Sequence, residues 1–138
     1  MLTQCLVKHL LKDYKHRRWP SLIISAPLHR SRVRECGFNQ ALEISRWVSS
    51  ALSIPLDRHS VIRRKPTDKQ TGLSASAKKL NLRSAFRIVP GCEFIPGVSV
   101  ALVDDVVTTG VTITELASVL RKAGVEDIHV WALARTPL

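Results

Sequence analysis

The stretch Val100-Ala-Leu-Val-Asp-Asp-Val-Val-Thr-Thr-Gly-Val-Thr112 decides the fold of this chain. It begins with apolar residues, continues with Asp104 and Asp105, and ends in a turn rich in threonine that opens a helix. The nearly continuous apolar run over 98–103 is typical of a central parallel strand covered on both faces. Because neighbouring carboxylates are costly to bury, we expect both acids to emerge into a polar cleft at the carboxyl end of this strand.

The turn after the two acids favours the binding of a phosphate. Unpaired backbone N–H groups and the positive end of the helix dipole attract anions at a helix N-terminus. Thr108, Thr109 and Thr112 add hydroxyl donors, and Gly110 permits a close approach of the backbone. The spacing of Thr112 and Glu115 is that of a capping box, which predicts the helix start there. Together with sugar-binding carboxylates, this turn predicts a sugar-phosphate ligand; the alternative is an N-capped helix preceded by solvated acids.

Strands and helices alternate along the rest of the chain. Apolar residues recur at helical spacing over 2–14, 38–52 and 113–123. Short apolar runs predict strands over 22–26, 60–63, 85–89, 98–103 and 128–134. This order predicts an α/β fold with a mostly parallel five-stranded sheet flanked by helices. No repeat or linker divides the chain, so we expect a single domain over residues 1–138.

The charge of the chain is unevenly distributed. The total is +10, with 21 Lys and Arg against 11 Asp and Glu. Residues 1–98 hold 18 basic and 6 acidic side chains, whereas residues 99–138 hold 3 basic and 5 acidic ones. Such a surplus attracts nucleic acid, a phosphorylated small molecule or an anionic membrane surface. A basic surface that only keeps the protein in solution is the alternative.

Composition excludes several classes of protein. A hydrophobic content of 45% argues against intrinsic disorder. No apolar run approaches the ~18 residues of a membrane span, and charged residues interrupt the N-terminal apolar stretch, unlike a signal peptide. The three cysteines, Cys5, Cys36 and Cys92, have neither disulfide nor zinc spacing. We therefore expect a cytoplasmic protein with unpaired thiols and no zinc.

The stretch from Val100 to Thr112 resembles the signature of the type I phosphoribosyltransferases, which bind 5-phosphoribosyl 1-pyrophosphate (PRPP). Five further motifs resemble, in chain order, those of the ComF/GntX family of competence-related proteins: 26–29, 34–40, 70–73, 81–86 and 134–136. The resemblance implies a type I phosphoribosyltransferase-like domain that takes part in DNA uptake or utilisation. Many relatives begin with a zinc module of four cysteines, which is absent from this sequence.

The resemblance also implies the roles of individual residues. Asp104 and Asp105 would be the catalytic pair that holds the ribose hydroxyls and Mg²⁺, while pyrophosphate is displaced at the anomeric carbon. The implied cradle of the 5′-phosphate comprises Thr108, Thr109, Gly110, Val111 and Thr112, and the implied pyrophosphate loop comprises Pro27, Leu28, His29 and Arg30. Purine-salvage relatives usually carry an acid at the position of Thr108, so purine salvage is disfavoured and no general base is assigned.

A basic segment leaves two functions open. Its candidate residues for a lid or for nucleic-acid binding are Arg34, Lys65, Lys69, Lys78, Lys79 and Arg83. A lid would close over pyrophosphate and exclude water, whereas a basic track would bind single-stranded DNA. The chain is thus either a phosphoribosyltransferase of unknown acceptor, or a non-catalytic module that handles single-stranded DNA and uses PRPP as a regulatory ligand. Further expected partners are a second copy of the chain or the DNA-uptake machinery.

Overall fold

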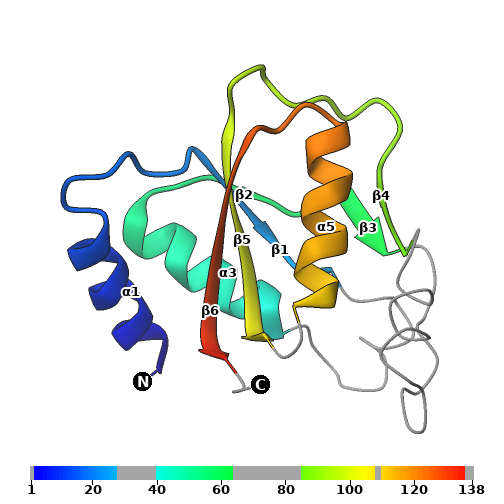
Figure 1. The fold of residues 1–138 in the computed structure, drawn as a ribbon. Coiled ribbons are helices and arrows are strands. Elements are labelled where there is room, and N and C mark those ends of the chain that lie inside the picture. The colour runs from blue at the N-terminus through cyan, green and yellow to red at the C-terminus, as the bar shows by residue number, and fades with distance from the viewer. Residues whose placement is uncertain (1, 28–39, 64–84, 108–109, 136–138) are drawn as a thin grey trace, which may run out of the picture.

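A computed structural model describes residues 2–27, 40–63, 85–107 and 110–135 of the chain (Figure 1). The helices and strands, labelled as in the figure, are α1 (Leu2–Asp13), β1 (Leu22–Ser25), α3 (Gln40–Leu52), β2 (Leu56–Asp57), β3 (Val61–Arg63), β4 (Phe86–Ile88), β5 (Ser99–Val107), α5 (Val111–Lys122) and β6 (Asp127–Arg135). In this part of the chain no helix is long and apolar enough to cross a membrane.

A parallel sheet with the strand order β2-β1-β5-β6 forms the centre of the molecule. Leu22 pairs with Val100 and Ser25 with Val103 between β1 and β5, while Val100 pairs with Ile128 between β5 and β6. The α/β class and the parallel sheet predicted from the sequence are confirmed. The strand count differs from the expected five, because the described sheet has four strands.

Two of the expected strands, β3 and β4, lie outside that sheet and form an antiparallel pair, with Val61 opposite Ile88. A turn before β3 redirects the chain. The Asp57 carboxylate accepts hydrogen bonds from the backbone N–H groups of His59 (2.9 Å) and Ser60 (3.0 Å) and from the Ser60 hydroxyl (2.5 Å). The chain therefore leaves the parallel sheet after the short strand β2, which the sequence analysis did not predict.

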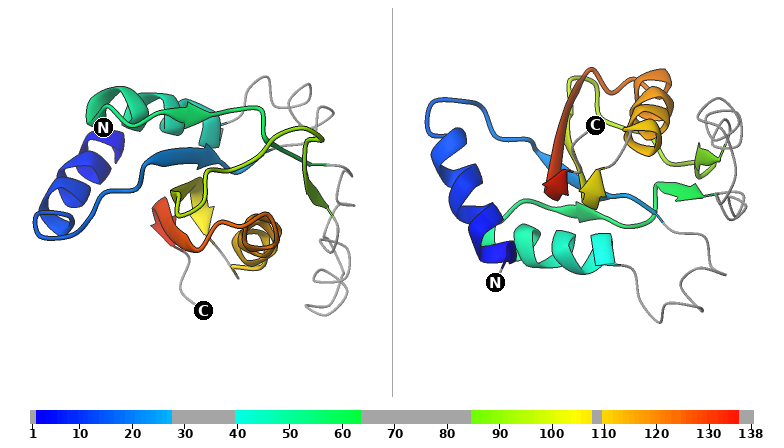
Figure 2. Two further views of the ribbon diagram at one scale, coloured as in Figure 1. Left: turned by 90° about the horizontal axis from the view of Figure 1, so that it is seen from above. Right: turned by 60° about the horizontal axis from the view of Figure 1, so that its bottom comes forward.

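Two apolar clusters cover the two faces of the sheet. Val100 and Leu102 of β5 pack with Leu116 of α5, whereas Ala101 and Val103 pack with α3 and α1 on the other face (Figure 2). All four of these β5 residues are fully buried. The expectation of a central strand covered on both faces is therefore confirmed, and this burial fixes the position at which β5 delivers its acids.

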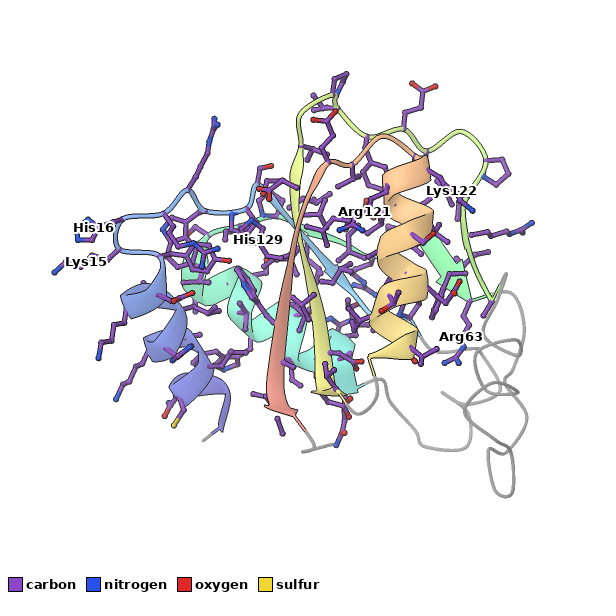
Figure 3. All side chains as sticks on the ribbon, in the orientation of Figure 1. Lys15, His16, Arg63, Arg121, Lys122 and His129 are labelled. Atoms are coloured by element: carbon purple, nitrogen blue, oxygen red, sulfur yellow. The ribbon has the colours of Figure 1, made fainter. Side chains whose placement is uncertain are left out.

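Helix α1 is joined to the sheet by a chain of hydrogen bonds through Tyr14. The Trp131 Nε1–H can only donate, and it donates to the Tyr14 hydroxyl over 3.2 Å. The Asp127 carboxylate can only accept, so Nε2 of His129 donates in their 3.1 Å hydrogen bond. In the neutral ring Nδ1 is then the acceptor, and it receives the hydrogen bond of the Tyr14 hydroxyl, 2.5 Å away. In Figure 3 the His129 side chain extends from β6 toward the C-terminal end of α1.

Candidate functional site

The carboxyl ends of β1 and β5 and the N-terminus of α5 meet at one edge of the parallel sheet (Figure 1). The backbone N–H of Ala26 donates to the Val103 carbonyl over 2.8 Å, which fastens the end of β1 beside the point where β5 becomes acidic. Pro27 follows on β1, Asp104 and Asp105 follow on β5, and Gly110 precedes α5. Open α/β sheets bind ligands at such an edge.

The two acids lie within β5, not after it as expected. The strand continues to Val107, with Asp104 opposite Ala132 and Val106 opposite Ala134 of β6. Strand β1 ends at Ser25, level with Val103, so beyond this point its paired residues no longer flank β5. Both acids are half-buried at the rim of the sheet. They lie beside β6 on one side, whereas β1 has already ended on the other side.

The surroundings of Asp104 disfavour its charged form. The pKa of Asp104 is raised from 3.8 to about 7, mainly by burial and next by a hydrogen bond with the Asp105 side chain. A hydrogen bond from the Asp105 backbone N–H to Oδ1 of Asp104, 2.9 Å long, works in the opposite direction. The Asp105 charge raises this pKa, and the Arg63 charge lowers it. In the absence of a ligand the pair thus resists carrying two full negative charges at neutral pH.

The N-terminus of α5 is built on Gly110, which is the N-cap of the helix. Its φ of 80° lies in the left-handed region that favours glycine, and a Cβ at this position would meet no atom within 4 Å. The first helical hydrogen bond runs from the Thr114 N–H to the Gly110 carbonyl over 2.9 Å. The N-cap is Gly110 and not Thr112, and no side-chain cap is found within the described residues, so the predicted capping box of Thr112 and Glu115 is wrong. The N–H groups of a first helical turn and the positive end of the helix dipole favour an anion at this position.

Arg63 is a further charged residue near the acids, and the sequence analysis did not assign it to the site. It ends β3, and its guanidinium carbon lies 5.4 Å from the centre of the Phe86 ring. Its charge acts on Asp104, as the effect on that pKa shows. Figure 3 places Arg63 at the same end of the molecule as the N-terminus of α5. The antiparallel β3-β4 pair that positions Arg63 could not be read from the sequence.

The predicted site residues divide into two groups. Those that the structure brings to the edge described above are Pro27, Asp104, Asp105, Gly110, Val111 and Thr112. Those outside the described residues are Leu28, His29, Arg30, Arg34, Lys65, Lys69, Lys78, Lys79, Arg83, Thr108 and Thr109. Among the described residues no group of three or more His, Cys, Asp or Glu could hold a metal ion.

Comparisons with known proteins agree on the domain. The family described as phosphoribosyl transferase domain matches residues 39–137. Competence protein F of Haemophilus influenzae is 46% identical over 116 residues, which cover 84% of this chain and 51% of that protein. DNA utilization protein YhgH of Escherichia coli is 36% identical over 142 residues, which cover 98% of this chain and 61% of that protein. The chain therefore spans about half to three-fifths of the length of these relatives.

Solved structures show the same fold at low sequence identity. A purine phosphoribosyltransferase from Pyrococcus horikoshii matches with a TM-score of 0.59 and 21% identity, covering 97% of this chain and 70% of that one. An adenine phosphoribosyltransferase from Saccharomyces cerevisiae matches with a TM-score of 0.62 and 14% identity, covering 97% and 69%. The type I phosphoribosyltransferase-like fold expected from the sequence is thereby confirmed.

Proposed function

This chain belongs to the phosphoribosyl transferase domain family, and on that premise we propose that it binds PRPP with Mg²⁺ at the end of β5 and transfers the phosphoribosyl group to an acceptor that is not identified. One observation carries the proposal. A half-buried pair of carboxyl groups lies beside a helix N-terminus at the carboxyl edge of a parallel sheet. Carboxylates accept hydrogen bonds from ribose hydroxyls, and helix N–H groups donate to phosphate.

The acidic pair also suits Mg²⁺. Two crowded carboxyl groups, one with a pKa raised to about 7, gain from a divalent cation that offsets their repulsion. Carboxylate oxygens are preferred Mg²⁺ ligands, and the ion usually keeps several waters and substrate oxygens. These properties fit a magnesium site in which Asp104 and Asp105 supply the carboxylate oxygens of the protein. The bound ion would neutralise charge on the pyrophosphate.

In this reaction the described residues would mainly position charge. Asp104 and Asp105 would hold the ribose, and the backbone from Gly110 to Thr112 would hold the 5′-phosphate, which fixes the anomeric carbon between them. As the bond from that carbon to pyrophosphate breaks and the bond to the acceptor forms, positive charge develops on the ribose. The acidic pair would stabilise this charge, and Arg63 would stabilise negative charge on the leaving pyrophosphate.

Calorimetric titration with PRPP and Mg²⁺ tests the proposal. We expect binding by the unmodified chain and at least a roughly tenfold loss of affinity in Asp104→Asn/Asp105→Asn. Asp13→Asn/Glu43→Gln is the matched control, because it removes the same number of negative charges from exposed positions in α1 and α3. Unchanged affinity in the first variant would contradict the proposal. Pyrophosphate release with candidate acceptors then measures turnover.

A second function is favoured by the names of the relatives, which refer to competence and DNA utilisation. The chain would use its basic surface to handle single-stranded DNA, with PRPP as a regulatory ligand and no turnover. This function predicts salt-sensitive binding of single-stranded DNA that is weakened by Lys78→Ala/Lys79→Ala/Arg83→Ala. Lys12→Ala/Arg121→Ala/Lys122→Ala removes as many charges elsewhere and is the control. This second function would be contradicted if the affinity for single-stranded DNA did not depend on salt concentration, or if both variants lowered it equally.

The setting of this activity is also proposed. We place the protein in the cytoplasm, in association with the DNA-uptake machinery or as a homodimer. PRPP is a highly charged metabolite and does not cross a membrane unaided, so a domain in the cytoplasm would have direct access to it. Co-purification with the uptake machinery from competent cells would test the association.

A further inference from the structure

Strand β6 forms one margin of the parallel sheet. It is the last strand in the order β2-β1-β5-β6, and it pairs with β5 along one side from Asp127 to Arg135 (Figure 2). Within the described parts of the chain, no strand pairs with its other side. An edge of this length presents a row of backbone N–H and C=O groups to which another strand can pair.

The sequence of β6 has few of the features that normally protect an edge strand. Natural edges are blunted by lysine, proline, bulges or inward-pointing charges. The strand reads Asp-Ile-His-Val-Trp-Ala-Leu-Ala-Arg, with no lysine, proline or glycine, and both charged residues are at its ends. Val130, at its middle, is 47% exposed although it is apolar and β-branched. This edge is thus long, apolar and well suited to pairing.

Helix α1 flanks β6 without filling the space beside it. A cavity of about 340 Å³ lies between them, and its lining combines α1 residues such as Leu6 and Leu10 with the β6 segment 128–132. The Tyr14–His129 hydrogen bond holds α1 at one end of this cavity. The helix therefore forms a wall beside the edge and leaves room next to the middle of β6.

We propose that β6 pairs in the antiparallel sense with β6 of a second copy of this chain, so that two four-stranded sheets become one continuous sheet. Charge and side-chain character favour this occupant. When Trp131 is the centre of the two-fold pairing, Asp127 of one copy lies opposite Arg135 of the other, at both ends of the interface. Opposite charges at facing positions stabilise such pairs.

The same register matches the apolar positions. Ile128 then lies opposite Ala134, and Val130 lies opposite Ala132, so the exposed valine is covered by the partner. A slip of one residue would exchange the two faces of the partner's strand, and a slip of two would set His129 opposite Arg135. We therefore expect one register and a dissociation constant in the micromolar range, because a pair of single strands buries less area than a standard interface.

Analytical ultracentrifugation of the chain tests the interface. We expect the unmodified chain to pass from monomer to dimer across the micromolar range. Val130→Lys should raise the dissociation constant roughly tenfold or more, because lysine protects natural edges. Ile95→Lys makes the same substitution at an apolar residue that is 78% exposed in the turn before β5, and it should dimerise like the unmodified chain.

Two results would overturn the proposal: a chain that stays monomeric throughout, or a Val130→Lys variant that is folded by circular dichroism and dimerises normally. The register has its own test, which requires no added charge. In a background with the three native cysteines replaced by serine, Val130→Cys chains are mixed with Ala132→Cys chains and oxidised. The mixture should cross-link faster than either variant alone, since these positions face each other across the pair. Equally fast cross-linking of one variant with itself would refute this register. Neither test depends on PRPP binding.

Discussion

Replacing Asp104 by asparagine should stabilise the ligand-free protein at alkaline pH. In the folded chain the pKa of this carboxyl is raised from 3.8 to about 7, first by burial and then by its hydrogen bond with the Asp105 side chain. Folding therefore disfavours the ionised form of Asp104. Below its ordinary pKa the group is protonated in both states and costs nothing. As pH rises toward 7 the unfolded chain releases the proton first, and stability is progressively lost.

The size of the effect follows from this shift. A difference between 3.8 and about 7 corresponds to about 4 kcal/mol if it is fully expressed in the free energy of unfolding. Asp104 is only half-buried, so water screens its charge, and we expect about half of that value. Asp104→Asn should raise the free energy of unfolding by about 2 kcal/mol at about pH 8, and by less than about 1 kcal/mol at about pH 5.

Urea denaturation of both chains in the presence of EDTA measures this difference without a bound cation. Asp13→Asn is the control, because Asp13 is an exposed partner of Arg17 at 3.0 Å and such pairs contribute about 1 kcal/mol or less. The reasoning would be refuted if Asp104→Asn gave the same change at both pH values, or destabilised the protein at the higher one. Added Mg²⁺ and PRPP should reverse the ranking and stabilise only the unmodified chain.

Three further substitutions probe the fold and the site. Tyr14→Phe removes the hydroxyl that links α1 to two ring nitrogens of β6, and it should lower the free energy of unfolding by about 2 kcal/mol in urea denaturation. Gly110→Ala and Gly97→Ala place a Cβ at φ values of 80° and 81°, so each should cost about 1 kcal/mol, but only the former should weaken PRPP binding in calorimetry. Leu116→Ala opens a cavity at a fully buried position and should cost about 3 kcal/mol, measured by thermal unfolding.

The central elements could be predicted from the sequence because burial on both faces leaves a plain signal. The apolar run over 98–103 predicted the core of β5, and helical spacing predicted α5. The end of α5 also follows a local signal, because glycine favours the left-handed conformation found there: the φ of Gly124 is 99°, and the Val125 N–H donates to the Leu120 carbonyl over 3.0 Å. In each case a local pattern and tertiary packing favour the same conformation.

Other features depend on contacts between distant residues, which a local pattern does not reveal. Strand β2 has two residues, and β1 supplies its partners. The separation of β3 from the parallel sheet depends on the Asp57 turn and on pairing with Phe86, far along the chain. The capping box failed because the N-cap of the helix is Gly110, in a left-handed conformation, two residues before Thr112. Arg63 joined the site only through this pairing.

The position of Asp104 shows which part of the candidate site a sequence pattern can indicate. A strand that continues to Val107 would be more stable with an apolar residue at this half-buried position, and the raised pKa of Asp104 measures part of that conflict. Residues that oppose local stability are expected where a ligand compensates for them. The two adjacent acids already oppose the apolar pattern of their strand in the sequence, before any contact is known. Val130 is a different case. It is an exposed apolar residue on an open edge, and such a residue is stabilised by a partner strand that covers it and not by a charged ligand.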